Sequence, residues 1–208
     1  LGLTPLLQAV PHFDLIHGIN DPVAHTLNHG IADTLLDVIF ANGAAKNMKP
    51  WRVANTHRGE LESRVRAVQT VDDVSRPLKR LTEARSHWTY DDSAWFFTVY
   101  LPLIGLYHFI QAEWMRDCLW YCARMIQHAW FLYSPGMTYQ ESLDSAQNCA
   151  EKFAAAAESN EQWDLCTSNL HSLVCHMFKS EHKCGPVARR RDLGIERFIG
   201  ELKYGVVN

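Results

Sequence analysis

The chain has 208 residues, of which 47% are hydrophobic and 21% are charged. This composition supplies a substantial core and excludes a broadly disordered protein. Lys and Arg together number 20 against 23 Asp and Glu, so the formal net charge is −3. That balance excludes a protein that coats nucleic acid through overall positive charge, although it permits a local basic patch. The length predicts one domain, spanning residues 1–208.

The sequence also bears on where the protein acts. It begins at Leu1 and contains no charged segment followed by an apolar stretch, so we expect no signal peptide and a fragment of a longer protein. The longest weakly charged run, residues 95–110, is shorter than a membrane span and contains Pro102. A buried helix is therefore favoured there, and no membrane partner is expected. Six irregularly spaced cysteines favour reduced thiols in the cytosol or nucleus.

Apolar residues recur mostly at helical spacing, so the sequence predicts a mainly α fold. A first helix is expected over residues 22–40, with Asp21 as its N-cap. Its apolar side chains, spaced four residues apart, form one stripe: Val23, Leu27, Ile31, Leu35 and Ile39. A less patterned, exposed helix is expected over residues 58–69.

Two capping sequences predict where later helices begin. Thr89-Tyr-Asp-Asp precedes an apolar helix that Pro102 should kink or split. Thr138-Tyr-Gln-Glu is a capping box that opens a helix ending near Glu158. Further helices are expected over residues 113–132, 169–178 and 192–202.

The C-terminal third contains many side chains of the kinds that bind metals: Cys166, His171, Cys175, His176, His182 and Cys184. Thiolates and imidazoles in such proximity bind zinc. No Cys-x-x-Cys or His-x-x-x-His unit completes a four-ligand pattern in this stretch. Buried thiols and hydrogen-bonded histidines are therefore favoured over a zinc site.

A basic cluster and one glutamate stand out near the C-terminal end of the sequence. Arg189, Arg190 and Arg191 lie close to Arg197, and adjacent guanidinium groups contact phosphates in nucleic-acid complexes. A solvated face explains so short a run as well. Glu196 lies in an apolar and basic segment, where an unpaired buried carboxylate is costly. Its partner is either an arginine or a metal, and the residues alone leave both open.

Asp21 and His25 lie together at the start of the first predicted helix. Their spacing favours a helix cap for Asp21 and an exposed or hydrogen-bonded first-turn residue for His25. The alternative is a carboxylate and imidazole pair that orients other groups at a site.

Three blocks of the sequence resemble, in order, the transposases of CACTA-type DNA transposons and the helical domain associated with them. The first block, Thr4-Pro-Leu-Leu through Phe13-Asp14 to Asp21-Pro-Val-Ala-His25 and Gly30, resembles the family's SPLL…YFDP…DPMHNLFLG stretch. The second block, Arg76-Pro-Leu-Lys-Arg80 with Trp88-Thr89 and Trp95, is similar to IPRKI…FTADQWKNW. The third block, Cys166-Thr-Ser-Asn-Leu-His171 with Cys184-Gly-Pro186 and Ile195-Glu-Arg-Phe-Ile-Gly200, resembles CTPNMH…GPV…FERYNGIL.

The resemblance implies the helical insertion and C-terminal region of a ribonuclease H-like cut-and-paste transposase, with the core strands largely missing from this fragment. Such enzymes hold two Mg²⁺ ions with three acidic residues, and the metals promote phosphodiester cleavage and strand transfer. The implied partners are DNA at the transposon ends and further copies in a homo-oligomer, and the implied location is the nucleus. The arginine cluster is the expected DNA contact. Since the first two acids precede the Asp-x-x-His motif, the fragment alone should be inactive.

The resemblance also assigns roles to single residues. Glu196 matches the glutamate of the family's Phe-Glu-Arg motif, which makes it the expected third catalytic acid and a metal ligand. Asp21 and His25 match the Asp and His of the Asp-x-x-His motif, a supporting pair near the active site. One extra residue separates them in this chain, and on an α-helix it rotates His25 by about 100°. Asn28-His29 replaces an apolar pair, and Ile195 replaces the usual Phe.

A non-catalytic alternative is a transposon-derived helical module whose aromatic-rich helices bind a protein partner or DNA. An upstream sequence that lacks the two aspartates would favour this module. A zinc-stabilised helical domain is a third interpretation, and stoichiometric zinc in the purified chain would be required for it.

Overall fold

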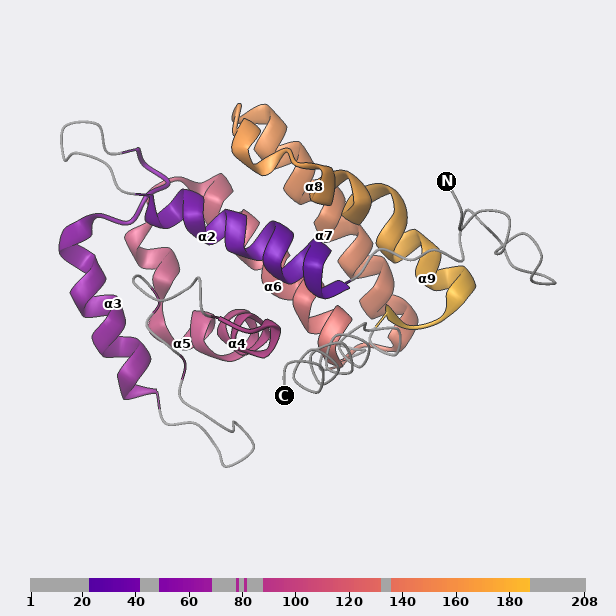
Figure 1. Ribbon diagram of the computed structural model, residues 1–208, viewed down its shortest axis with the longest axis horizontal. Coiled ribbons are helices and arrows are strands. Elements are labelled where there is room, and N and C mark those ends of the chain that lie inside the picture. Colours follow the sequence, from indigo (N-terminus) through magenta and orange to yellow (C-terminus); the bar gives the residue numbers. More distant parts are fainter. Residues whose placement is uncertain are drawn as a thin grey trace, which may run out of the picture.

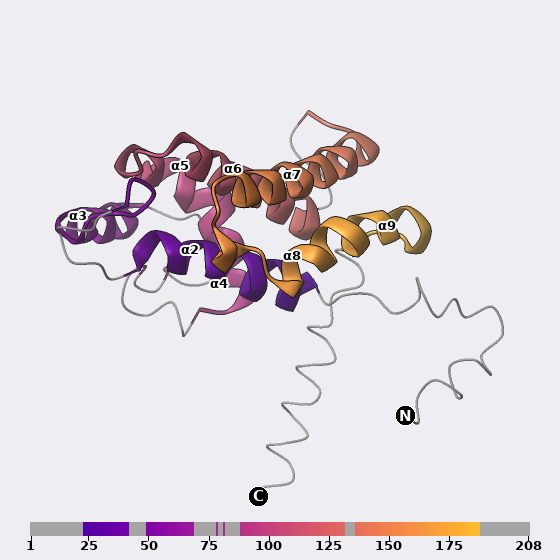
Figure 2. The same ribbon diagram turned by 90° about the horizontal axis from the view of Figure 1, so that it is seen from above.

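The computed structural model describes residues 23–41, 49–68, 78, 81, 88–131 and 136–187. These residues form a layered arrangement of helices, and no strand occurs among them (Figures 1 and 2). The mainly α prediction is thus confirmed for this part of the chain. Within it, no helix is both long enough and apolar enough to cross a membrane.

The predicted first helix is present as two continuous segments. Ala24–Ala32 (η1) is π-helical and Asp33–Phe40 (α2) is α-helical. The predicted apolar stripe is buried along its whole length. The backbone N–H of Asp33 donates to the carbonyl of Asn28, five residues earlier, so each turn holds more residues than an α-helix does. Apolar spacing of four fits both helix types, which is why the sequence did not predict the π geometry.

The exposed helix predicted over 58–69 is Asn55–Ala67 (α3), which begins three residues earlier. Only Leu61 and Val65 are buried on it, as its polar sequence predicts. One guanidinium nitrogen of Arg64 donates to the carbonyl of Ile104 at 3.0 Å and so links α3 to the helical segment that ends at Ile104.

Thr89 caps the following helix, Tyr90–Trp95 (α4), as predicted. Its N–H donates to the Asp92 carboxylate at 2.7 Å, and its hydroxyl accepts from the Asp92 N–H. The chain then passes through Phe96–Tyr100 (η4, π-helical), Leu101–Ile104 (α5) and Leu106–Phe109 (η5). Pro102 lies in the first turn of α5, and the backbone stays helical through Tyr100 and Leu101. The helix is therefore not split at the proline, and it ends at Gly105, which has φ +65°.

Two long antiparallel helices form the centre of the fold: Glu113–Phe131 (α6) and Tyr139–Ser159 (α7). Both lie where they were predicted, and the Thr138 capping box that opens α7 is present. Figure 1 shows η1 crossing α6, and the helical stretch over residues 173–184 lying along α7. The buried apolar residues of all these helices form one contiguous cluster.

The predicted helix over 169–178 is part of a longer helical stretch. After the short turn Trp163–Leu165 (η6), it comprises Ser168–Ser172 (α8), Leu173–Met177 (η7, π-helical) and Phe178–Cys184 (α9). It ends at Cys184, six residues beyond the predicted end at residue 178, and is followed by Gly185, which has φ +80°. The helix predicted over 192–202 lies outside the described residues.

Candidate functional site at the junction of the three blocks

Helix η1 is the place where the three blocks that carry the resemblance come together. The first block supplies η1 itself, the second supplies Thr89 at the start of α4, and the third supplies Asn169 on α8. Helix η1 packs directly against both α4 and α8. Segments that are far apart in the sequence therefore form one junction, which we call the block junction.

Two histidines and a tyrosine form the exposed side of the block junction. The Tyr90 hydroxyl lies 3.2 Å from Nε2 and 3.3 Å from Nδ1 of His25. The His29 ring lies 4.3 Å from the Tyr90 ring, and its Nδ1 donates to the Asp33 carboxylate at 2.7 Å. Both imidazoles are exposed, so they can exchange protons with solvent or meet a ligand. Chemically, this side offers a hydrogen-bonded imidazole and a phenol that orients it.

The buried side of the block junction is fixed by Asn28, which is fully buried. Its side-chain oxygen accepts from Trp130 Nε1 at 3.0 Å, and its amide donates to the Tyr90 carbonyl at 3.4 Å. These partners satisfy the buried side-chain amide, so its burial leaves neither its oxygen nor its nitrogen unpaired. Asn28 thereby links η1 to α4 and α6.

Gly30 allows η1 and α8 to approach each other closely. A Cβ atom added at Gly30 would lie 2.4 Å from Nδ2 and 2.9 Å from Cβ of Asn169. Neither distance is compatible with van der Waals contact, so any larger residue at Gly30 pushes α8 away. The glycine and the asparagine of two different blocks are thus spatial partners.

Of the residues expected at the catalytic site, the structure describes only His25, which lies on the block junction next to Tyr90. Asp21 and Glu196 lie outside the described residues, and so do the expected DNA contacts Arg189, Arg190, Arg191 and Arg197. The assigned roles of these residues stay predictions.

The cysteines and histidines considered for zinc are only partly brought together. Cys175 Sγ lies 3.6 Å from His171 Nδ1, and the His171 and His176 rings are 5.3 Å apart. Cys166 is separate from them, and burial raises its pKa, as does the nearby Glu158. Across residues 23–187, as far as they are described, no three His, Cys, Asp or Glu side chains are close enough to hold a metal ion. The described donors therefore do not fit zinc or Mg²⁺ without further ligands.

A buried polar network that the sequence did not predict links α6, α7 and α9. Nδ1 of His128 lies 2.9 Å from the Ser142 hydroxyl, and its Nε2 lies 3.2 Å from both carboxylate oxygens of Glu181. The Tyr139 hydroxyl donates to the same carboxylate at 2.7 Å. Serine, histidine and glutamate also form hydrolase triads, but Ser142 and His128 are each 1% exposed, so no substrate reaches this serine. The network holds three helices together instead.

Two hollows open on the surface of the described part. An apolar groove of about 670 Å³ lies between η4, α5 and α6, with Leu101, Tyr107 and Trp120 in its walls. Arg116 and Arg124 lie at the same groove. A smaller and more polar hollow of about 440 Å³ lies between the end of α2, Trp51-Arg52 and the turn at residues 161–164. Both draw residues from separate segments, so neither was predictable from spacing.

Comparisons with models of protein families, with curated proteins and with solved structures found no match for this chain. Functional inference therefore depends on the residues of the block junction and of the two hollows.

Proposed function

We propose that the chain is the helical region of a CACTA-like cut-and-paste transposase, which cleaves and joins DNA with Mg²⁺ once the rest of the catalytic core is present. The observation that carries this proposal is the block junction. Three segments chosen only for their likeness to one family meet at η1: Tyr90, next to Thr89 of the second block, contacts His25, and Asn169 of the third block lies against Gly30. This arrangement supports the proposal, because a shared site requires the three blocks to be neighbours.

In this proposal Glu196 is the third metal-binding acid, and Asp21 and His25 support the site. Mg²⁺ would supply the charge that activates the attacking water or 3′-hydroxyl. The hydroxyl of Tyr90 orients the His25 imidazole, and the exposed ring offers a hydrogen-bonding group beside the DNA.

The remaining parts of the proposal follow from the same resemblance. The two missing acids and the strands of a ribonuclease H-like core would come from sequence outside this chain. The arginine cluster at 189–191, together with Arg197, would contact the phosphates of the transposon ends. A homo-oligomer in the nucleus is the assembly in which both ends would be cut.

Glu196→Gln in a protein that contains the complete core is the direct test. The amide removes the charge that holds the metal, so Mg²⁺-dependent nicking of a labelled transposon end should fall by at least about 100-fold. Glu201→Gln, five residues away, is the matched control and should nick normally. Nicking that survives Glu196→Gln would remove Glu196 from the metal site.

A second candidate function, a non-catalytic interaction module, is favoured by the apolar groove. Trp120 is 61% exposed at this groove, and Arg124 lies over its ring at 5.8 Å. Exposed apolar surface with a basic rim suits an acidic, partly apolar partner or a DNA strand. The module predicts that Trp120→Ala weakens partner binding by the chain while Glu196→Gln has no effect. If the chain acts as part of a transposase, Glu196→Gln should reduce DNA cleavage more than Trp120→Ala does.

A further inference from the structure

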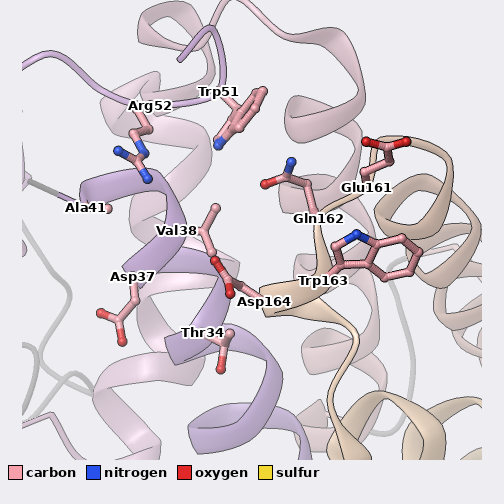
Figure 3. Close-up of a pocket in the computed structure, with 10 residues that line it drawn as sticks. All are labelled: Thr34, Asp37, Val38, Ala41, Trp51, Arg52, Glu161, Gln162, Trp163 and Asp164. Carbon is pink, nitrogen blue, oxygen red and sulfur yellow. The ribbon is translucent and has the colours of Figure 1, made fainter. Parts of the chain in front are cut away.

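The polar hollow between α2 and the turn at residues 161–164 has the features of a ligand site. Figure 3 shows the side chains that line it, contributed by three separate segments of the chain. Its volume, about 440 Å³, is within the range of small-molecule sites. The hollow lies apart from the block junction and shares none of its residues.

Two groups at this hollow are left unused by the fold. Trp163 is 66% exposed, more than any other large apolar side chain described. Arg52 Nε is buried and has no hydrogen-bond partner among the described residues. The positive φ of Glu161, +54°, has a structural cause, because the N–H groups of Glu161 and Gln162 bond back to carbonyls of the last turn of α7 and close that helix. The exposed indole thus offers a stacking surface, and the rest of the Arg52 guanidinium offers donors, to a ligand in the hollow.

The polar groups in the hollow define the chemistry of that ligand. In Figure 3 the Asp164 carboxylate and the Gln162 amide extend from the turn towards α2, and the Arg52 guanidinium lies across from them. Arg52 only donates hydrogen bonds and Asp164, when ionised, only accepts them. The ligand must therefore present hydrogen-bond acceptors to Arg52 and hydrogen-bond donors to Asp164. The indoles of Trp51 and Trp163 at the same hollow favour a flat, stacking ring.

We propose that this hollow binds a guanine base. Guanine presents two acceptors, O6 and N7, which is the pair that arginine contacts most often. Its N1–H and N2–H groups are adjacent donors that match the two oxygens of one carboxylate, here Asp164. Adenine, cytosine and thymine each lack one of these paired edges. Gln162 can supplement either edge, because its amide both donates and accepts.

The charges around the hollow indicate how the base is presented. Asp37, Glu161 and Asp164 outnumber the cations at the hollow, which are Arg52 and Lys49, whose ammonium lies 5.5 Å from the centre of the Trp51 ring. The net negative charge disfavours a phosphate there. In Figure 3 Asp37 and Glu161 lie on opposite sides of the hollow and point away from its centre, so they leave its interior to Arg52, Gln162 and Asp164. We therefore infer an unstacked guanine with its phosphates held outside, rather than a free nucleotide. As a base within DNA it rests on the proposed function, although binding of guanosine is measurable separately.

Calorimetric titration of the 208-residue chain with nucleosides tests the inference. Guanosine should bind at least about tenfold more tightly than adenosine, cytidine or thymidine. Guanosine 5′-monophosphate should bind no more tightly than guanosine, and a thymine oligonucleotide containing one guanine should bind more tightly than one without. If guanosine 5′-monophosphate binds much more tightly than guanosine, the inference that the base belongs to a strand with its phosphates outside the hollow is wrong. Equal binding of all four nucleosides, or no binding, would overturn the site.

Asp164→Asn should change which nucleoside binds best, an effect that loss of structure cannot produce. The asparagine amide donates where the carboxylate accepted, so guanosine should weaken at least about tenfold while xanthosine, which has an oxygen in place of the 2-amino group, should gain affinity. Asp144→Asn, an exposed aspartate on α7, is the matched control and should leave both unchanged. Trp163→Ala should weaken every nucleoside, because it removes stacking rather than edge recognition.

The outcomes for the hollow and for the transposase are separable. Guanosine selectivity that switches to xanthosine in Asp164→Asn supports the site even if Glu196→Gln leaves DNA nicking intact. Nicking that depends on Glu196 without any guanosine selectivity supports the proposed function and overturns the guanine site. Unchanged selectivity in Asp164→Asn, in a variant with native thermal unfolding, also overturns it.

Discussion

Truncation of Glu181 to alanine should destabilise the fold strongly, because this carboxylate is the common acceptor of the buried network. It lies 3.2 Å from His128 Nε2 and 2.7 Å from the Tyr139 hydroxyl. Glu181→Ala removes both acceptor oxygens and leaves a space where the side chain packed. His128, 1% exposed, cannot turn to water, whereas Tyr139 is 36% exposed and its hydroxyl can.

These two contacts set the magnitude. A buried polar group left without its hydrogen-bond partner costs about 1–3 kcal/mol, and the space left by the truncated side chain adds to this cost. His128 keeps its contact with Ser142, but its buried Nε2 loses its partner, so we expect a loss of about 3 kcal/mol of unfolding free energy. Glu181→Gln keeps the volume and one acceptor oxygen, so its cost should be about half as large.

Urea unfolding followed by circular dichroism at pH 7 measures these losses. Glu158→Ala, an exposed glutamate near the end of α7, is the control and should change the unfolding free energy by less than about 0.5 kcal/mol. A double-mutant cycle of Glu181→Ala with His128→Ala should show a coupling of about 1 kcal/mol or more. A loss below about 1 kcal/mol in Glu181→Ala would refute the description of the network as a buried structural link.

The block junction and the thiols give further predictions. Gly30→Ala should cost about 1–3 kcal/mol through its clash with Asn169. Asn169→Ala in the same chain should restore part of this loss, because it removes Cγ and Nδ2 but keeps the Cβ atom 2.9 Å away. Gly59→Ala in α3 is the control, because an added Cβ there meets nothing within 4 Å, and it should stabilise the fold by about 0.5–1 kcal/mol. Equal effects of the two substitutions would contradict the close approach of Gly30 to Asn169. Burial raises the pKa of Cys118 to about 12 from about 9, so its contribution to stability is full below pH 9 and is lost towards pH 12; denaturant midpoints should fall across that range. Iodoacetamide should modify Cys175, beside His171, before Cys118, as peptide mass spectrometry of the native chain can show.

Helix positions were largely predictable because their signals are local. The capping sequences at Thr89 and Thr138 place the starts of α4 and α7, since the residues that satisfy the free amides lie within the same turn. The stripe from Val23 to Ile39 marks the buried face of the first helix in the same way. The π-helical turns were missed, because they change hydrogen bonding without changing which residues are apolar.

The sites were less predictable because their contacts are not local. His25 was singled out from the sequence, but its partner Tyr90 lies on another helix, and no spacing rule joins them. Gly30 and Asn169 each belong to a quoted block, and only the packing of η1 on α8 makes them neighbours. The buried Glu181 and the hollow at Trp163 carry no motif at all. The one signal for Glu181 in the sequence is its place four residues after the apolar Met177, which itself lies four residues after the apolar Leu173.

The central claim is that this chain forms one wall of a metal-dependent DNA-cleaving site, with Glu196 as a ligand and the start of η1 nearby. Iron-mediated cleavage tests it most directly: Fe²⁺ replaces Mg²⁺ in a protein that contains the complete core, and ascorbate with peroxide then cuts the backbone beside the metal. We predict cuts close to Glu196 and close to Asp21 and His25, all lost on addition of excess Mg²⁺ and in Glu196→Gln. Cuts that are absent from both segments, or that persist in Glu196→Gln, would contradict the claim.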